Sequence, residues 1–125
     1  MTYSAAAADI QLTIDGVRNA RGSVYVLLFD NPAAFAQIDT NRAIDFAEIR
    51  ARPGKLTHVF RGLDAGPFAI MLFHDENGDG DFNMAGERAL EGYGLSGSKG
   101  PDDFPDFRNA SFSSGAVSVK IHYVN

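Results

Sequence analysis

The apolar residues of this sequence repeat at every second position in short runs, and no long stretch keeps the 3.6-residue period of an amphipathic helix. Ile10, Leu12 and Ile14 alternate with polar residues and predict a half-buried strand. The runs 23–29 and 68–73 are apolar at nearly every position, which is typical of central strands covered on both faces. Six or seven short runs separated by turn signals predict an all-β fold, a single antiparallel β-sandwich of about seven strands.

The other segments are predicted from capping and turn signals. Asn31 before Pro32 is a good N-cap and first-turn pair, so residues 33–38 are expected to form a short helical turn. The stretch 85–114 is rich in Gly, Ser, Asp and Pro, which predicts a long ordered loop with a short helix near 87–90. A polar stretch that begins at His74 is expected to end the strand before it. Three further strands are expected, at 43–51, 55–61 and 117–123.

Composition favours one soluble domain. The length of 125 residues suits a single core, and we place it at 9–125, after a tail or signal-peptide remnant at 1–8. Acidic residues outnumber basic ones by 16 to 11, and the basic residues are scattered, so the sequence has no nucleic-acid footprint. It has no apolar run long enough for a membrane span, and no cysteine for disulfides or thiolate chemistry. The small residues at the start resemble those around a signal cleavage site, although a cloning scar or a disordered tail would look the same.

An acidic loop is the most distinctive chemical feature. Oxygen-bearing side chains alternate through the stretch 75–83, with Gly80 where a sharp turn is needed, which is the pattern of the first half of a calcium loop. The twelfth position, which should carry a bidentate carboxylate, is Gly86, so Glu87 or Glu91 would have to substitute. The predicted Ca²⁺ ligands are Asp75, Asn77, Asp79, Asp81, Asn83 and Glu87.

The charge of this loop supports the same prediction. Its four carboxylates lie within seven residues with no Lys or Arg among them, so a cation would relieve their mutual repulsion. The alternative is a plain solvated turn, because Asn-Gly and Asp-Gly are also strong hairpin signals.

Two other residues are candidates for chemistry. His74 beside Asp75 could form an acid-base pair, but neighbouring strand residues point to opposite faces, which favours a hydrogen-bonded histidine at a strand end. Tyr93 lies between two glycines, so its ring either caps the edge of the core or contacts a ligand. No serine lies in the context of a nucleophile elbow.

Three blocks of the chain, in this order, resemble a known family: 63–69 (LDAGPFA), 73–80 (FHDENGDG) and 91–96 (EGYGLS), followed by Phe107, Ala110 and Phe112. The chain from about Ile10 onward is similar to the bacterial family catalogued as domain of unknown function 2141. The resemblance implies an exported, periplasmic or cell-surface β-sandwich of immunoglobulin- or transthyretin-like character, with no established activity.

We therefore expect a non-enzymatic extracytoplasmic module, periplasmic or secreted, with a calcium-stabilised acidic loop. It would bind a protein, a glycan or a small ligand through its loops. The alternatives are a hydrolase that uses His74 with the loop carboxylates, and a carrier of small apolar ligands with a cavity between its sheets.

Overall fold

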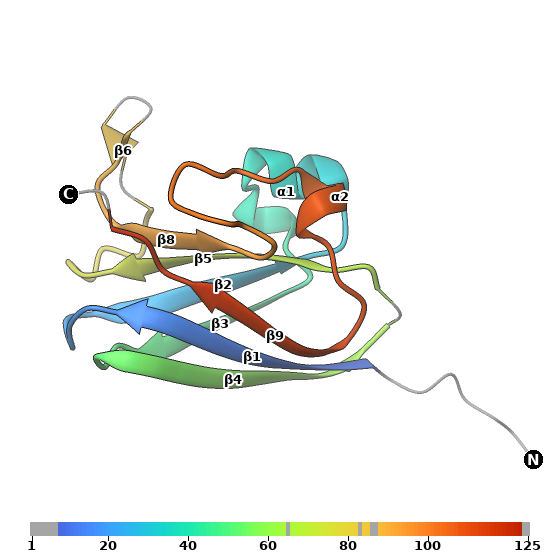
Figure 1. Cartoon of the computed structure of the whole chain (residues 1–125), viewed down its shortest axis with the longest axis horizontal. Coiled ribbons are helices and arrows are strands. Elements are labelled where there is room, and N and C mark those ends of the chain that lie inside the picture. The colour runs from blue at the N-terminus through green and yellow to red at the C-terminus, as the bar shows by residue number, and fades with distance from the viewer. Residues whose placement is uncertain (1–7, 65, 83, 86–87, 124–125) are drawn as a thin grey trace, which may run out of the picture.

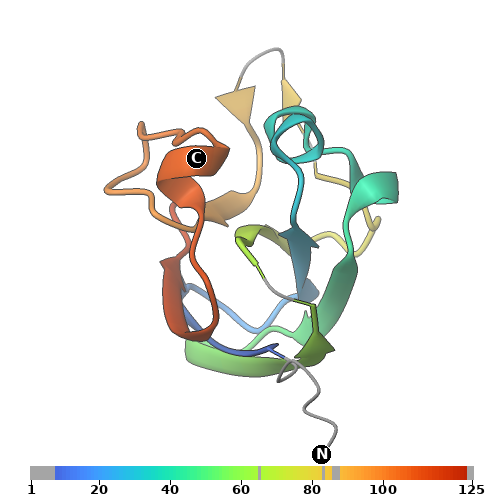
Figure 2. The same ribbon diagram turned by 90° about the vertical axis from the view of Figure 1, so that its right-hand side faces the viewer.

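The protein is a β-sandwich with two short helices on one outer face (Figures 1 and 2). The structure is a computed structural model that describes residues 8–64, 66–82, 84–85 and 88–123. Its strands are β1 (Ala8–Val17), β2 (Ser23–Phe29), β3 (Asp45–Arg50), β4 (Gly54–Leu63), β5 (Ala69–Asp75), β6 (Met84–Ala85), β7 (Arg88–Ala89), β8 (Gly92–Leu95) and β9 (Gly115–Lys120). Its helices are α1 (Pro32–Gln37), the 3-10 turn η1 (Thr40–Arg42) and α2 (Phe107–Ala110).

The sandwich has seven strands among the described residues, in a sheet ordered β4-β1-β9 and a second sheet ordered β3-β2-β5-β8. The prediction of a sandwich of about seven strands is therefore confirmed. The expected antiparallel pairing fails at one pair, because β1 and β9 run parallel, with Ile10 opposite Gly115. Parallel neighbours need a long connection, and here residues 18–114, which include all the other strands, lie between β1 and β9.

The inner core fills the space between the sheets. Ile10, Leu12 and Ile14 of β1 point into it and are almost completely buried, as the alternation predicted. Strand β5 is buried on both faces and β2 is buried except at Ser23 and Tyr25, because α1 and α2 cover part of the outer face of their sheet (Figure 2). The outer cluster consists of Leu27, Phe29, Ala34, Phe35, Ala69, Met71, Phe73, Tyr93 and Ala110.

The short helix predicted after residue 31 is confirmed. Asn31 caps α1 by accepting a hydrogen bond from the Ala34 amide, and Pro32 lies in its first turn. The helix ends at Ile38, which adopts a left-handed conformation (φ 49°). Among the described residues, no helix has the length and apolarity needed to cross a membrane.

Two local predictions are wrong. Strand β5 does not end before His74 but continues through Asp75, because both side chains find polar partners in neighbouring loops. The helix expected near 87–90 is not formed, since Arg88 and Ala89 pair with β6 as strand β7. Within the predicted long loop, residues 92–95 form β8, which pairs with β5.

Two glycines of β8 allow this strand to lie close to residues 119–123. A Cβ on Gly92 would collide with the ring of Tyr123, and a Cβ on Gly94 would approach the Lys120 carbonyl oxygen to 2.5 Å. The Tyr93 side chain, on the opposite face, is 7% exposed and packs in the outer cluster, so the prediction of packing at the core edge is confirmed.

Candidate functional site

Strand β5 ends with two polar residues whose side chains point to opposite faces of its sheet. His74 points toward the inner core and is fully buried, whereas Asp75, 1% exposed, points toward the outer face. The two side chains therefore belong to different environments. They do not form the acid-base pair that the hydrolase alternative would need.

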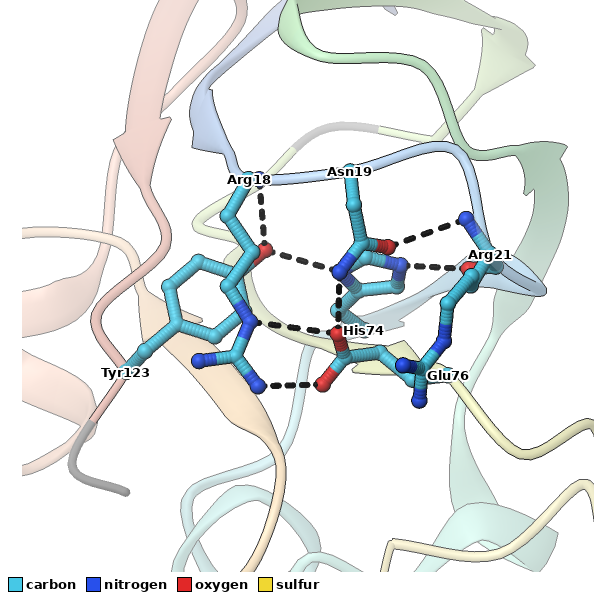
Figure 3. A network of polar contacts seen from close by, with 6 residues as sticks. All are labelled: Arg18, Asn19, Arg21, His74, Glu76 and Tyr123. Atoms are coloured by element: carbon cyan, nitrogen blue, oxygen red, sulfur yellow. Dashed lines mark hydrogen bonds and ion pairs between the residues drawn. The ribbon is translucent and has the colours of Figure 1, made fainter.

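His74 is held at both ring nitrogens (Figure 3). Its Nε2 lies 2.6 Å from the Arg21 carbonyl oxygen, which can only accept, so Nε2 carries a proton. Its Nδ1 lies 2.7 Å from the Tyr123 hydroxyl, which in turn accepts a hydrogen bond from the Arg18 amide. With Nε2 as the donor to Arg21, Nδ1 is the nitrogen that accepts the hydrogen bond from the Tyr123 hydroxyl. The predicted hydrogen-bonded histidine is confirmed.

Glu76 is neutralised by a cation from a distant segment. The Arg18 guanidinium donates to both of its carboxylate oxygens, at 2.7 and 3.1 Å, and the Asn19 side chain donates to one of them (Figure 3). Arg18 also lies over the Tyr123 ring, 4.3 Å from its centroid. The hydrogen bond from Arg18 lowers the pKa of Glu76 to about 2, with a smaller contribution from Asn19, although burial acts in the opposite direction. One of the four loop carboxylates thus has a basic partner that the local sequence does not show.

The acidic loop is a series of tight turns. Gly78 and Gly80 both have positive φ angles, of 73° and 78°, so the turn predicted at Gly80 is confirmed. The Asn77 and Asp79 side chains accept hydrogen bonds from the amides two residues further on, and the Gly80 amide donates to Asp75 Oδ2 over 2.8 Å. These bonds fold the loop back over the outer face of the sheet, where Phe82 packs against Phe73.

Three carboxylates converge where this loop meets the sheet. One oxygen each of Asp75, Asp79 and Glu91 lies within 4.8 Å of the other two. Glu91 directly precedes β8, whose Gly92 pairs with His74, so the antiparallel register sets Glu91 opposite Asp75 on the same face. Asp75 and Glu91 are 1% and 5% exposed, whereas Asp79 is exposed. Asp75 Oδ1 is buried and has no hydrogen-bond partner among the described residues.

The predicted ligands divide into three groups. Asp75 and Asp79 are brought together, and Glu91 occupies the place expected for Glu87. Asp81 is exposed and lies outside this group, while Asn77 is bonded to Asp79 at the rim of the turn. Asn83 and Glu87 lie outside the described residues.

A cleft of about 650 Å³ adjoins the loop on the outer face. Its floor consists of Tyr25, Leu27 and Phe73 from β2 and β5. One wall is formed by residues 80–82 of the acidic loop. The other wall is formed by Ile38, Thr40, Ala43, Ile44, Asp45 and Phe46. The sequence patterns did not reveal this cleft, because its walls come from segments that are far apart in the chain.

Aromatic rings continue from this cleft across the sheet. Tyr25 stacks on Phe73 with ring centroids 5.4 Å apart, and Phe82 contacts both Phe73 and Tyr93. Burial raises the pKa of the Tyr25 phenol, and the negative charges of nearby carboxylates, Glu48 foremost, raise it further. The cleft is therefore lined by aromatic rings and lies in a negative electrostatic potential.

A model of the family described as an uncharacterized protein conserved in bacteria (DUF2141) matches residues 12–122. The chain therefore belongs to this bacterial family. The comparisons with curated proteins and with solved structures gave no match.

Proposed function

We propose that this family member is a non-enzymatic, extracytoplasmic binding module whose acidic loop is stabilised by Ca²⁺. The observation that carries the proposal is the convergence of Asp75, Asp79 and Glu91, two of them buried. The buried Oδ1 of Asp75 has no hydrogen-bond partner among the described residues and independently points to a bound ligand, because such an atom costs about 1–3 kcal/mol unless something binds it.

The donor set selects a hard cation. Three carboxylates supply only oxygen, which suits Ca²⁺ or Mg²⁺, and the group contains neither histidine nor cysteine, the ligands that zinc prefers. Ca²⁺ accepts six to eight oxygens in flexible geometry, so backbone carbonyls of a glycine-rich loop and water can complete its shell. We assign Asp75 and Glu91 as the ligands fixed by the sheet and Asp79 as the ligand brought by the loop.

The hydrogen bonds of His74 support a non-enzymatic role. A general base must be able to exchange its proton with a substrate. Both nitrogens of His74 are instead occupied within the fold, and its side chain faces away from the acidic loop. Buried side chains from both sheets also fill the space in which an apolar carrier would need its cavity.

An extracytoplasmic location agrees with the expected affinity of such a site. Calcium sites of extracellular modules commonly have dissociation constants of about 10⁻⁴–10⁻³ M, which matches millimolar external calcium. Saturation would then add about 1–2 kcal/mol to the free energy of unfolding. The ion thus stabilises the module and holds its loop against the sheet.

Thermal unfolding tests this proposal. We expect several millimolar CaCl₂ to raise the melting temperature by about 3–10 °C over EDTA. Asp75→Asn and Glu91→Gln should abolish the rise, whereas Asp30→Asn, at an exposed carboxylate after β2, should retain it. Equal melting temperatures of the unmodified protein in both buffers would refute the calcium site.

A second measurement covers the case in which the buried variants do not fold. Asp79 is exposed, so Asp79→Asn is expected to fold normally and to bind the ion less tightly. Luminescence of Tb³⁺, sensitised by nearby tyrosines such as Tyr25, should titrate in the native protein and be displaced by Ca²⁺. Asp79→Asn should shift that titration to at least fivefold higher metal concentration.

A further inference from the structure

We infer that the cleft between the acidic loop and residues 38–46 is a binding site for a small organic cation, an ammonium group attached to an apolar body. This inference rests on the proposed binding role of the module but not on its calcium site. The site is formed by side chains that the structure brings together from β2, β3, β5 and two loops.

Three large apolar side chains that line this cleft are exposed to solvent. Of the six large apolar residues exposed among those the structure describes, three line the cleft, namely Ile38, Ile44 and Phe46. Phe46 is 63% exposed, which is costly for a residue with no packing role. The volume falls within the range of roughly 300–1,000 Å³ that is common for small-molecule sites.

The charged residues that line the cleft favour a positively charged ligand. The two charged residues that line the cleft, Asp45 and Asp81, are both acidic and exposed, and they lie on different walls. The nearby Arg42 is directed elsewhere, since its guanidinium donates to Asn31 and lies 3.9 Å from an Asp39 carboxylate oxygen. A ligand with one positive charge would therefore meet two carboxylates and no lining cation.

The aromatic lining fits the same ligand. The rings of Tyr25, Phe46, Phe73 and Phe82 line the cleft and come from four separate segments. An ammonium group is attracted to ring faces by about 0.5–2 kcal/mol, depending on how far it is desolvated. Rings with carboxylates bind an organic cation through both its charge and its apolar body, whereas an anion would be repelled.

The experiment uses three probes of similar shape and different charge. Phenethylammonium, 2-phenylethanol and 3-phenylpropionate are titrated into the ¹⁵N-labelled protein, both in EDTA and in CaCl₂, while amide shifts are followed by NMR. We expect the ammonium to bind with a dissociation constant below about 1 mM and to shift the amides of residues 45–46 and 80–82. The alcohol should bind at least tenfold more weakly, and the anion should cause no shifts there.

Variants separate the contributions of charge and ring. The double variant Asp45→Asn with Asp81→Asn should weaken phenethylammonium binding at least tenfold and leave 2-phenylethanol unchanged, while Phe46→Ala should weaken both. Asp30→Asn, which removes an equal charge outside the cleft, should leave binding within twofold. All of these positions are exposed, so the variants are expected to fold.

Four results would overturn the inference: equal binding of the alcohol, retention of binding by the double variant, shifts that map outside the cleft, or no binding in either buffer. A methyl glycoside that shifted the cleft amides more strongly than the ammonium would reassign the site to glycans. Calcium stabilisation without ammonium binding would leave the proposed metal site standing. Ammonium binding without calcium stabilisation would support the cation site in the cleft and refute the calcium site.

Discussion

Tyr123 donates its hydroxyl proton to Nδ1 of His74 over 2.7 Å, and this bond joins the segment after β9 to the end of β5. The same hydroxyl accepts a hydrogen bond from the Arg18 amide, at 3.1 Å, so it links three segments that are distant in sequence. Burial raises the pKa of this phenol, which keeps it protonated and able to donate.

Removal of the Tyr123 hydroxyl should destabilise the fold. Tyr123→Phe leaves Nδ1 of the fully buried His74 without a donor, and we expect the free energy of unfolding to fall by about 1–3 kcal/mol. The matched control is Tyr93→Phe, which removes a hydroxyl that donates to the Pro101 carbonyl oxygen at a part-buried position. Urea denaturation measures both variants. A Tyr123→Phe cost no larger than that of Tyr93→Phe would contradict the role assigned to this hydroxyl.

The ion pair between Arg18 and Glu76 should also contribute to stability. Glu76→Gln replaces a charge-assisted pair by neutral hydrogen bonds, and we expect a loss of about 1–3 kcal/mol, measured in EDTA so that no metal interferes. Glu48→Gln is the control, because Glu48 is exposed and bonded to Ser23. That change should cost less than about 1 kcal/mol. Equal losses in the two variants would show that the pair is no stronger than a surface contact.

Two glycines with nearly the same backbone angle should respond very differently to alanine. Gly22 (φ 65°) and Gly62 (φ 68°) both adopt the left-handed conformation, which costs alanine about 1–2 kcal/mol. At Gly62 the new methyl group would meet nothing, whereas at Gly22 it would collide with the backbone carbonyl of Asp75. Gly22→Ala should therefore lower the melting temperature well below that of Gly62→Ala. Similar melting temperatures would mean that the turn at Gly22 relaxes freely.

Mild acid should weaken the fold through His122. Burial lowers the pKa of this imidazole, and Lys120 lowers it further, so the folded state disfavours the proton relative to the unfolded state, whose pKa is about 6.5. The contribution of neutral His122 is complete above that pH and is lost as the pH falls through 6.5 toward the lower folded value. The melting temperature of the unmodified protein minus that of His122→Gln should accordingly decrease between pH 7.5 and pH 5. A constant difference would exclude this linkage.

The strands were largely predictable because their signals are local. Ile10, Leu12 and Ile14 alternate within one strand, and the run 23–29, apolar at all but its first position, indicates coverage on both faces, so neither required knowledge of a partner. Strand direction carries no such local signal, which is why the parallel pairing of β1 with β9 was not predicted. The helix expected near 87–90 was wrong because pairing of β7 with β6 overrode the local preference.

The candidate metal site was predictable only in part. Asp75 and Asp79 lie in a recognisable loop pattern, but Glu91 reaches them through the register of β5 with β8, which a linear motif does not encode. The ion pair of Glu76 with Arg18 bridges 58 residues, so the repulsion inferred from the loop alone was overestimated. The cleft was missed for the same reason, since its lining comes from four separate segments.

The parallel pairing of β1 with β9 constrains the order in which the molecule assembles. Residues 115–120 leave the ribosome about a hundred residues after their partners in β1, so the sheet that contains both cannot be completed until they emerge. Until then one edge of β1 has unsatisfied backbone groups, although β4 can already pair with the other edge. Until β9 emerges, the nascent chain therefore has an unpaired strand edge that can pair with other chains. Pairing β9 with β1 also closes a long loop, which is an entropically costly step.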